Sequence, residues 1–340
     1  TNRLCGVREA ESIRRVLRLN QQPTTNNQQP TTESSMVAYE TQASGKLANI
    51  SLYRLEGGKV VESTGRFHVD MSDRLNYEFE DDWKHLGTHT RIGSLLSRDD
   101  SIVKLSKSAL NTDALSYIHY GAPANLSGFE MCSNRTIDCT DLCLNTSGNG
   151  RYHSNQIYRM ARTRFEVYCP AEFWNMFRSE LETAKRRLAK SGKSFLAIRP
   201  NGTTDRWNDY LDYVVGKNPD VRFYDYSAVP SRLAIADMFH NYDVTLSRKE
   251  TKRNHEWLRA EGYGKRNVAV VCTESVKAEL MKAGSLEGIG IVDFDKHDLR
   301  LPEYDGNGII GLLTPKGKAR GVDSGFVVSS VAQLRAEIVG

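Results

Sequence analysis

Three of the chain's six cysteines fall within one short stretch, CSNRTIDCTDLC. Cys132, Cys139 and Cys143 follow the spacing C-x6-C-x3-C, so a single loop can bring their thiolates together. Thiolates are soft ligands, and three of them suit an iron–sulfur cluster or part of a zinc site. Three cysteines would leave one iron of a [4Fe–4S] cluster free to bind another group. That open position favours catalysis over a purely structural role.

Zinc remains an alternative for this cysteine cluster. A closed zinc site needs a fourth ligand, for which His153 and Cys169 are the candidates, and the spacing differs from the short knuckles typical of zinc ribbons. A further alternative is that the thiols are neighbours that bind no metal. A disulfide framework is not expected, because thiols stay reduced in a reducing compartment and a chain of 340 residues does not need disulfides for stability.

Composition places the chain among ordinary soluble globular proteins. Hydrophobic residues make up 39% and charged residues 26% of the chain, and the formal net charge is +4. No run of eighteen apolar residues occurs, and the first thirty residues lack an apolar signal-peptide core, so we expect a cytoplasmic protein without membrane contact. The small positive charge permits an anionic partner such as nucleic acid but does not require one.

The order of sequence patterns predicts three regions. Residues 1–35 are expected to form a flexible tail, because the polar low-complexity stretch at 20–35 cannot bury a core, although residues 8–19 could form a short basic helix. Residues 36–110 alternate apolar and polar residues between turn signals, which predicts a small antiparallel β region. Residues 111–335 are expected to form the main domain.

The main domain alternates short apolar runs with longer helical patterns. The runs are ALSYIHY, FLAIRP, VRFYDYS, YDVTLS, NVAVVC and GIGIVDFD. Strand–helix alternation is typical of βαβ units on a parallel sheet. We therefore predict an α/β fold, a partial or full β/α (TIM-like) barrel, with the β-rich region as an N-terminal elaboration.

Polar residues follow each predicted strand, and in β/α barrels chemistry collects at those carboxyl ends. Asp205, Asp225 and His297 are the candidate catalytic residues, since carboxylates and imidazole perform general acid–base chemistry. Arg199 could bind a phosphate or carboxylate group of a cofactor or substrate. The alternative is that each residue is simply a polar group in a solvated loop.

Several ordered motifs carry a resemblance to a known family. They are the cysteine stretch, RPNGTTDRW (199–207), RFYDYSAVPSR (222–232), NYDVTLSRKE (241–250), NVAVVC (267–272) and the segment from DKHDLR through GIIGLLTPKGKAR to SGFVV (295–328). Together they resemble the gene product 88 family of actinobacteriophages over roughly residues 105–330. The resemblance implies a phage origin and a location in the host cytoplasm, and it names no reaction.

A cysteine loop followed by β/α units is also similar to the layout of radical S-adenosylmethionine enzymes. That likeness implies that Cys132, Cys139 and Cys143 hold a [4Fe–4S] cluster whose free iron binds S-adenosylmethionine. It also implies support for the cofactor's amino group from the next strand end, at Asn201, Gly202, Thr203 and Thr204. The usual spacing in those enzymes is C-x3-C-x2-C, and NGTT here takes the place of their GGEP-like stretch.

Three functional hypotheses follow. The first is a phage iron–sulfur enzyme, similar to the radical S-adenosylmethionine group, acting on a small molecule or a nucleic acid. The second is a non-enzymatic protein stabilised by zinc or by a cluster, whose basic runs at 248–253 and 316–320 bind nucleic acid or a host protein. The third is a degenerate barrel without metal. Walker, nucleophile-elbow and HExxH motifs do not occur, which excludes the enzyme classes that they mark.

Overall fold

The computed structural model divides the chain into two units, Thr1–Gly93 and Ser94–Gly340. The residues that it describes are 13–18, 36–44, 47–56, 59–70, 76–80, 90–98 and 110–340, with side chains from Ile92 onward. Most of the expected tail, including the low-complexity stretch at 20–35, lies outside the described residues.

The first unit contains an antiparallel sheet in the order β1-β2-β3-β4-β5-β6. Its strands are β1 (Ile13–Arg18), β2 (Met36–Ser44), β3 (Leu47–Glu56), β4 (Lys59–Asp70), β5 (Asn76–Glu80) and β6 (Thr90–Ile92). The short helix predicted over residues 8–19 is wrong, because Ile13–Arg18 is a strand that pairs along β2. Its β-branched residues suit an edge strand, and pairing with β2 outweighs the weak helical pattern.

The second unit contains a nine-stranded, mostly parallel sheet in the order β13-β14-β15-β12-β11-β10-β9-β8-β7. Its strands are β7 (Leu96–Ser97), β8 (Ala114–His119), β9 (Phe195–Arg199), β10 (Val221–Ser227), β11 (Tyr242–Ser247), β12 (Val268–Val271), β13 (Ser285–Leu286), β14 (Ile289–Asp293) and β15 (Ile310–Leu313). Six apolar runs predicted as strands are thus strands of this sheet.

The sheet is open, so the chain does not form a closed TIM-like barrel. Strands β8 to β12 are neighbours in chain order and run parallel, as in a barrel. After β12, however, the next strand in the sheet is β15, with β14 outside it. A hairpin places β13 antiparallel on one edge, and β7 runs antiparallel on the other. The two edge strands therefore do not pair with each other.

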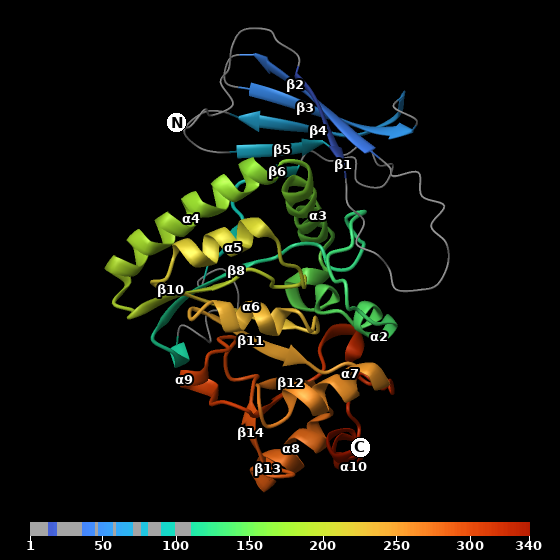
Figure 1. Cartoon of the computed structure of the whole chain (residues 1–340), viewed down its shortest axis with the longest axis vertical. Coiled ribbons are helices and arrows are strands. Elements are labelled where there is room, and N and C mark those ends of the chain that lie inside the picture. The colour runs from blue at the N-terminus through green and yellow to red at the C-terminus, as the bar shows by residue number, and fades with distance from the viewer. Residues whose placement is uncertain are drawn as a thin grey trace. The chain divides into compact units, whose positions relative to one another are not determined.

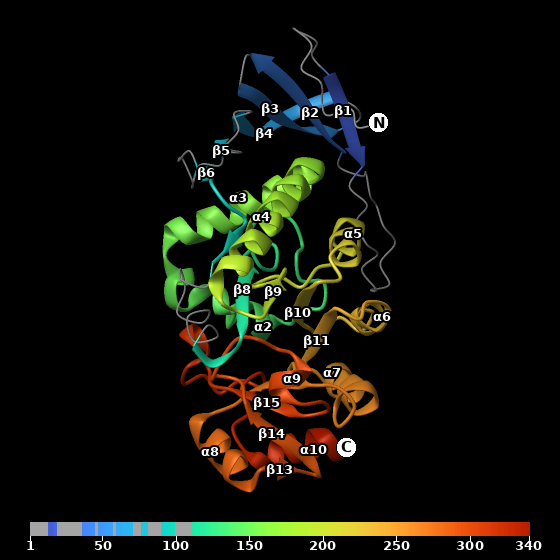
Figure 2. The ribbon, with the colours of Figure 1, turned by 90° about the vertical axis from the view of Figure 1, so that its left-hand side faces the viewer.

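Helices connect the parallel strands, and Figures 1 and 2 show α5, α6 and α7 following one another along the sheet. The helices are α2 (Ile137–Asp141), α3 (His153–Tyr168), α4 (Pro170–Ser191), α5 (Asp209–Lys217), α6 (Arg232–Met238), α7 (Lys252–Trp257), α8 (Glu274–Ala283), α9 (Pro302–Asp305) and α10 (Val331–Val339). Shorter turns are η1 (Leu144–Thr146), η2 (Gly148–Arg151), η3 (Leu258–Gly262) and η4 (Gly317–Ala319).

Helix α4 is bounded by a proline and a glycine. Pro170 stands at its amino end, where its missing N–H costs nothing, and Gly192 ends the helix in the left-handed conformation with φ 70°. None of the helices in the described ranges combines the length and the apolar character needed to cross a membrane.

The two faces of the parallel sheet are covered differently. One face packs against α7, α8, η3 and α10 through an apolar cluster that includes Leu246, Val270, Leu280 and Leu334. On the other face, the segment that links β14 to β15 crosses the strands. Its Leu299 and Leu301 pack with Ala114, Ala197 and Tyr224 from β8, β9 and β10. This crossing segment (residues 294–305) fills the side that would be the interior of a barrel.

Candidate functional site

The cysteine segment lies between β8 and α3. Cys132 forms an isolated parallel bridge with Asp205, which follows β9. Cys139 lies within α2, and Cys143 stands immediately before η1, where its Sγ accepts the N–H of Asn145 at 3.5 Å. All three cysteines are half-buried. The segment is thus attached to the carboxyl end of the sheet.

The three thiols lie close enough for their charges to act on one another. Burial raises the pKa of Cys132 to about 12, and the charges of Asp205, Cys143 and Cys139 add to that rise. Burial also raises the pKa of Cys143, and the charge of Cys139 raises it further. Cys132 and Cys143 therefore keep their protons at neutral pH unless a cation replaces those protons.

Lys249 is the common neighbour of the three thiols. It comes two residues after β11 ends, and its Nζ donates to Cys139 Sγ at 2.9 Å. Burial disfavours the charged form of Lys249, yet its interactions with Cys139, Asp205 and Cys132 raise its pKa overall. Its own charge lowers the pKa of Cys143. An ammonium group thus faces the place where the thiolates would gather.

Within the described residues, no group of three or more His, Cys, Asp or Glu side chains is arranged to hold a metal ion. A closed zinc site, one of the alternatives from the sequence, needs four ligands around one ion at about 2.0–2.3 Å. The side chains as they stand do not provide that arrangement.

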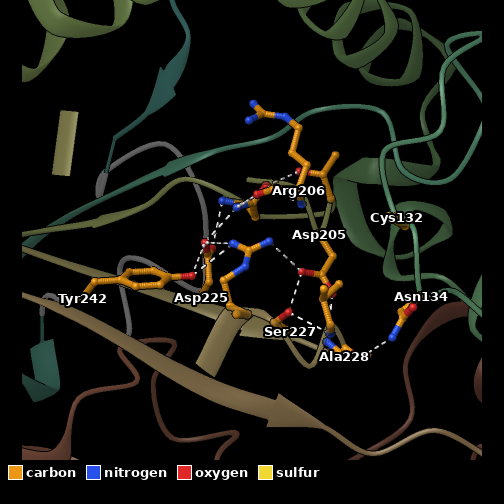
Figure 3. Close-up of polar contacts among 12 residues, drawn as sticks. Cys132, Asn134, Asp205, Arg206, Asp225, Ser227, Ala228 and Tyr242 are labelled. Carbon is orange, nitrogen blue, oxygen red and sulfur yellow. Dashed lines mark hydrogen bonds and ion pairs between the residues drawn. The ribbon is translucent and has the colours of Figure 1, made fainter. Parts of the chain in front are cut away.

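Asp205 joins the cysteine segment to the neighbouring strand. Its carboxylate accepts Ser227 Oγ at 2.7 Å, the N–H of Ala228 at 2.8 Å and Arg232 Nη2 at 3.2 Å (Figure 3). Its own N–H donates to the carbonyl of Met131 at 2.9 Å. These contacts hold the Cys132 loop against the carboxyl end of β10.

Asp225, which Figure 3 labels in the same network, is fully buried. Asn201 donates to it twice, from the backbone N–H at 2.9 Å and from Nδ2 at 2.8 Å. Burial raises the pKa of Asp225 to about 6, against the opposing charge of Arg232. Asp205 and Asp225, two candidate catalytic residues, are thus brought together by Arg232, which lies 3.8 Å from an Asp225 oxygen.

Residues 201–204 form hydrogen bonds with neighbouring groups of the protein. Asn201 Oδ1 accepts Thr204 Oγ1 at 2.9 Å, and Thr203 Oγ1 donates to the carbonyl of Gly121 at 2.6 Å. The N–H of Gly202 donates to the carbonyl of His119 at 2.8 Å. These bonds fix the turn after β9 beside the cysteine loop, where the Thr203 carbonyl lies 3.9 Å from Cys132 Sγ.

Gly202 is required for close packing against β8. A Cβ at this position would lie 2.5 Å from Ile118 Cγ2 and 2.7 Å from the His119 carbonyl oxygen. We therefore expect Gly202→Ala to lower the free energy of unfolding by about 1–3 kcal/mol, measured by urea denaturation. Gly290→Ala, whose Cβ would meet Ile309 at an ordinary 3.5 Å, is the matched control. Equal stability of the two variants would contradict the packing argument.

Arg199 lies at the end of β9 and points over the face covered by the crossing segment. Its guanidinium pairs with Asp298 at 3.0 Å and lies 4.6 Å from the centre of the Tyr226 ring. Burial opposes its charge, but Asp298 and the neighbouring tyrosines raise the pKa of Arg199 overall. Arg199 is therefore charged, with an internal carboxylate already bound.

His297 lies apart from the other candidate catalytic residues. Its Nδ1 is 3.0 Å from the Leu299 carbonyl, and its ring packs edge-on against Tyr304. Burial, with the charge of Arg300 adding to it, lowers the pKa of His297. Together with Asn111, these neighbours place His297 near the amino end of β8, away from the cysteine segment.

One residue near the cysteines was not among the candidates from the sequence. Arg232, at the start of α6, is 2% exposed and binds both Asp205 and Asp225. Lys249 lies in the basic run at 248–253 and was a candidate for binding a phosphate or carboxylate group of a substrate, but not a predicted neighbour of the cysteines. The signal that could have found both positions is a long cation just beyond the carboxyl end of a parallel strand, facing acidic or thiol groups.

The basic run at 248–253 does not form one basic face. Arg248 is buried and pairs with Glu337 of α10, with a further bond from its Nη1 to the Phe326 carbonyl at 2.8 Å. Lys249 faces Cys139. Arg248 thus ties α10 to the end of β11 and is not available on the surface.

Comparison with known proteins identifies the family. The family model for gene product 88 matches residues 94–330, which is most of the second unit. No curated protein and no solved structure matches the chain. The match includes the cysteine segment, the 199–207 and 222–232 motifs and the strands that position them. The chain therefore belongs to the gene product 88 family of phage proteins.

Proposed function

We propose that Cys132, Cys139 and Cys143 hold an iron–sulfur cluster and that the chain is an enzyme. The observation that carries the proposal is the position of the three thiols. They lie in one segment after the first strand of five sequential parallel strands, at the carboxyl edge of the sheet. Each thiol lies within range of the others' charge. Function in β/α folds concentrates at this edge.

The donor set fits a cluster better than a single ion. Three thiolates are the soft ligands of iron–sulfur chemistry, and a polynuclear cluster separates its cysteine ligands further than one ion does. The described side chains hold no metal-binding group as they stand, so the proposal depends on the thiol chemistry and on the position of the segment. Metal binding would also remove the protons that burial holds on Cys132 and Cys143.

A cluster held by three cysteines supplies one open iron, which in radical enzymes binds S-adenosylmethionine and delivers an electron. This likeness is the basis for proposing that cofactor here. The residues of the chain would act around it. Asp205 and Arg232 would position the Cys132 loop, and Lys249 would balance the negative charge of thiolates. The substrate would enter at the same edge of the sheet.

Metal analysis tests the proposal directly. The protein is reconstituted anaerobically with iron and sulfide, and iron, sulfide, zinc and the visible spectrum are measured. We expect about four irons and four sulfides per chain in the wild type. Cys139→Ala should lose the cluster and its visible absorption, while Cys169→Ala, a buried cysteine before α4, should keep both.

A zinc-only result, or equal iron content in the wild type and Cys139→Ala, would refute the cluster. If the cluster forms, reduction in the presence of S-adenosylmethionine should release 5′-deoxyadenosine. A cluster that leaves S-adenosylmethionine intact would instead leave a non-enzymatic iron–sulfur protein, the second hypothesis from the sequence.

A further inference from the structure

The parallel sheet splits between β11 and β12. On one side β11 pairs with β10 from Tyr242 to Leu246. On the other side it pairs with β12 only through Leu246–Val268 and Ser247–Ala269. The first residues of β11 therefore have no neighbouring strand on the β12 side. The split lies at the amino end of both strands, the edge opposite the cysteines.

A cavity of about 220 Å³ lies at this split. The first residues of β11, including Asp243 and Thr245, form one wall, and Arg266 and Asn267 just before β12 form another. His240, after α6, and Arg300, from the crossing segment, complete the lining. The cavity thus opens where the missing strand pairing leaves room.

The charged groups that line the cavity are mostly positive. Lys265, Arg266 and Arg300 face a single acidic residue, Asp243. Asp243 is already paired with Arg222 at 2.9 Å, and Arg222 also binds Glu303. Arg266 binds Asp237 on the surface. Because the one carboxylate is satisfied by another residue, the lining favours an anion.

Arg300 gives the second, independent observation. It is 1% exposed, and its Nε and Nη1 atoms have no hydrogen-bond partner. Nη2 donates to the His297 carbonyl at 2.6 Å, and Nη1 lies 3.3 Å from Asp305 without a hydrogen bond. Burial keeps the pKa of Asp305 near 7, so that carboxylate only partly balances the guanidinium. Buried donors without partners in a native fold call for a ligand, an ion or a water.

We propose that this cavity binds a small oxyanion: the phosphate or carboxylate group of a metabolite smaller than a nucleotide. The positive side chains of Lys265, Arg266 and Arg300 along the lining match the negative oxygens of either group. The volume of about 220 Å³ lies below the 300–1,000 Å³ typical of drug-sized ligands and suits an anionic group with a few further heavy atoms. The site lies at the opposite sheet edge from the cysteines and does not depend on the proposed cluster.

Calorimetric titration of the full chain tests the site. Inorganic phosphate and malonate are titrated at constant ionic strength into the wild type and into Lys265→Gln, which removes an exposed charge at the lining. We expect saturable binding of at least one anion and at least fivefold weaker binding in Lys265→Gln. Arg300→Lys, checked for folding by circular dichroism, should bind more weakly still.

Lys252→Gln is the matched control, because its side chain is 88% exposed and lies outside the cavity lining. It should bind like the wild type. Tighter binding of phosphate or of malonate identifies the anion class, and either result supports the site. No binding of either anion would overturn the proposal and leave water as the occupant. Equal weakening in Lys252→Gln and Lys265→Gln would overturn it as well, because it would indicate non-specific surface attraction.

Discussion

Arg232→Met should destabilise the protein by roughly 3–5 kcal/mol, because it leaves the buried Asp225 carboxylate without its ion-pair partner. Asp225 is fully buried, and Arg232 is the positive charge that lies between it and Asp205. Methionine keeps much of the side-chain volume, so the loss reports the charge and its bonds. Urea denaturation at pH 7.5 measures the change in unfolding free energy.

The pH dependence separates this effect from a simple packing defect. Burial already raises the pKa of Asp225 to about 6, and loss of Arg232 would raise it further. The difference between variant and wild type should therefore shrink as Asp225 becomes neutral in both, below about pH 5. Arg335→Met, which removes an exposed pair with Glu287, should cost less than about 1 kcal/mol. A pH-independent loss in Arg232→Met would contradict the electrostatic explanation.

The unfolding free energy of the wild type should fall as pH rises from about 4 to 7, and in Asp305→Asn this fall should be smaller. Burial raises the pKa of Asp305 to about 7, although the charge of Arg300 opposes the shift. In this window the folded chain keeps a proton that the unfolded chain has released. Unfolding therefore becomes easier as pH rises, by up to a few kcal/mol over the window.

Urea midpoints in phosphate-free buffers between pH 4 and 8 measure this slope. The curve of Asp305→Asn should be flatter than that of the wild type, and Asp225 contributes to the slope that remains between pH 4 and 6. Glu182→Gln, which changes a 57% exposed carboxylate, should give a curve parallel to the wild type. Parallel curves for the wild type and Asp305→Asn would show that Asp305 titrates alike in both states.

Much of the parallel sheet was predictable from local pattern. The run FLAIRP predicts β9 because short apolar runs are typical of strands that are covered on both faces. In the structure its Leu196 and Ile198 are completely buried. Pro170 and Gly192 bound α4 through backbone conformation alone. These patterns depend only on residues that are close in the sequence, so they predict the element whatever its tertiary contacts are.

The open sheet was not predictable in the same way. The runs that form β14 and β15 are short and equally apolar, and local sequence does not encode which of them pairs with β12. The crossing segment is also a tertiary feature. Leu299 and Leu301 are apolar residues in a loop, and nothing in the local sequence indicates that they pack against β8, β9 and β10.

Several residues of the candidate site were predictable from the sequence, but the residues that they contact were not. The cysteine spacing and the strand ends gave Cys132, Asp205 and Asn201. Arg232 binds residues 7 and 27 positions earlier in the chain, and Lys249 meets Cys139 across 110 positions. Pairings over such separations depend on how the parallel strands align, which no local motif specifies.

The position of β15 also has a consequence for how the chain is made. A ribosome releases β12 first, then β14 and finally β15, yet β15 lies between the other two. A nascent chain that has just exposed β14 carries an unpaired edge on β12 and a strand able to occupy it wrongly. In the folded chain β14 forms a hairpin with β13, which lies just before it in the sequence. We expect this local pairing to give β14 a partner while the strand that completes the sheet is still being synthesised.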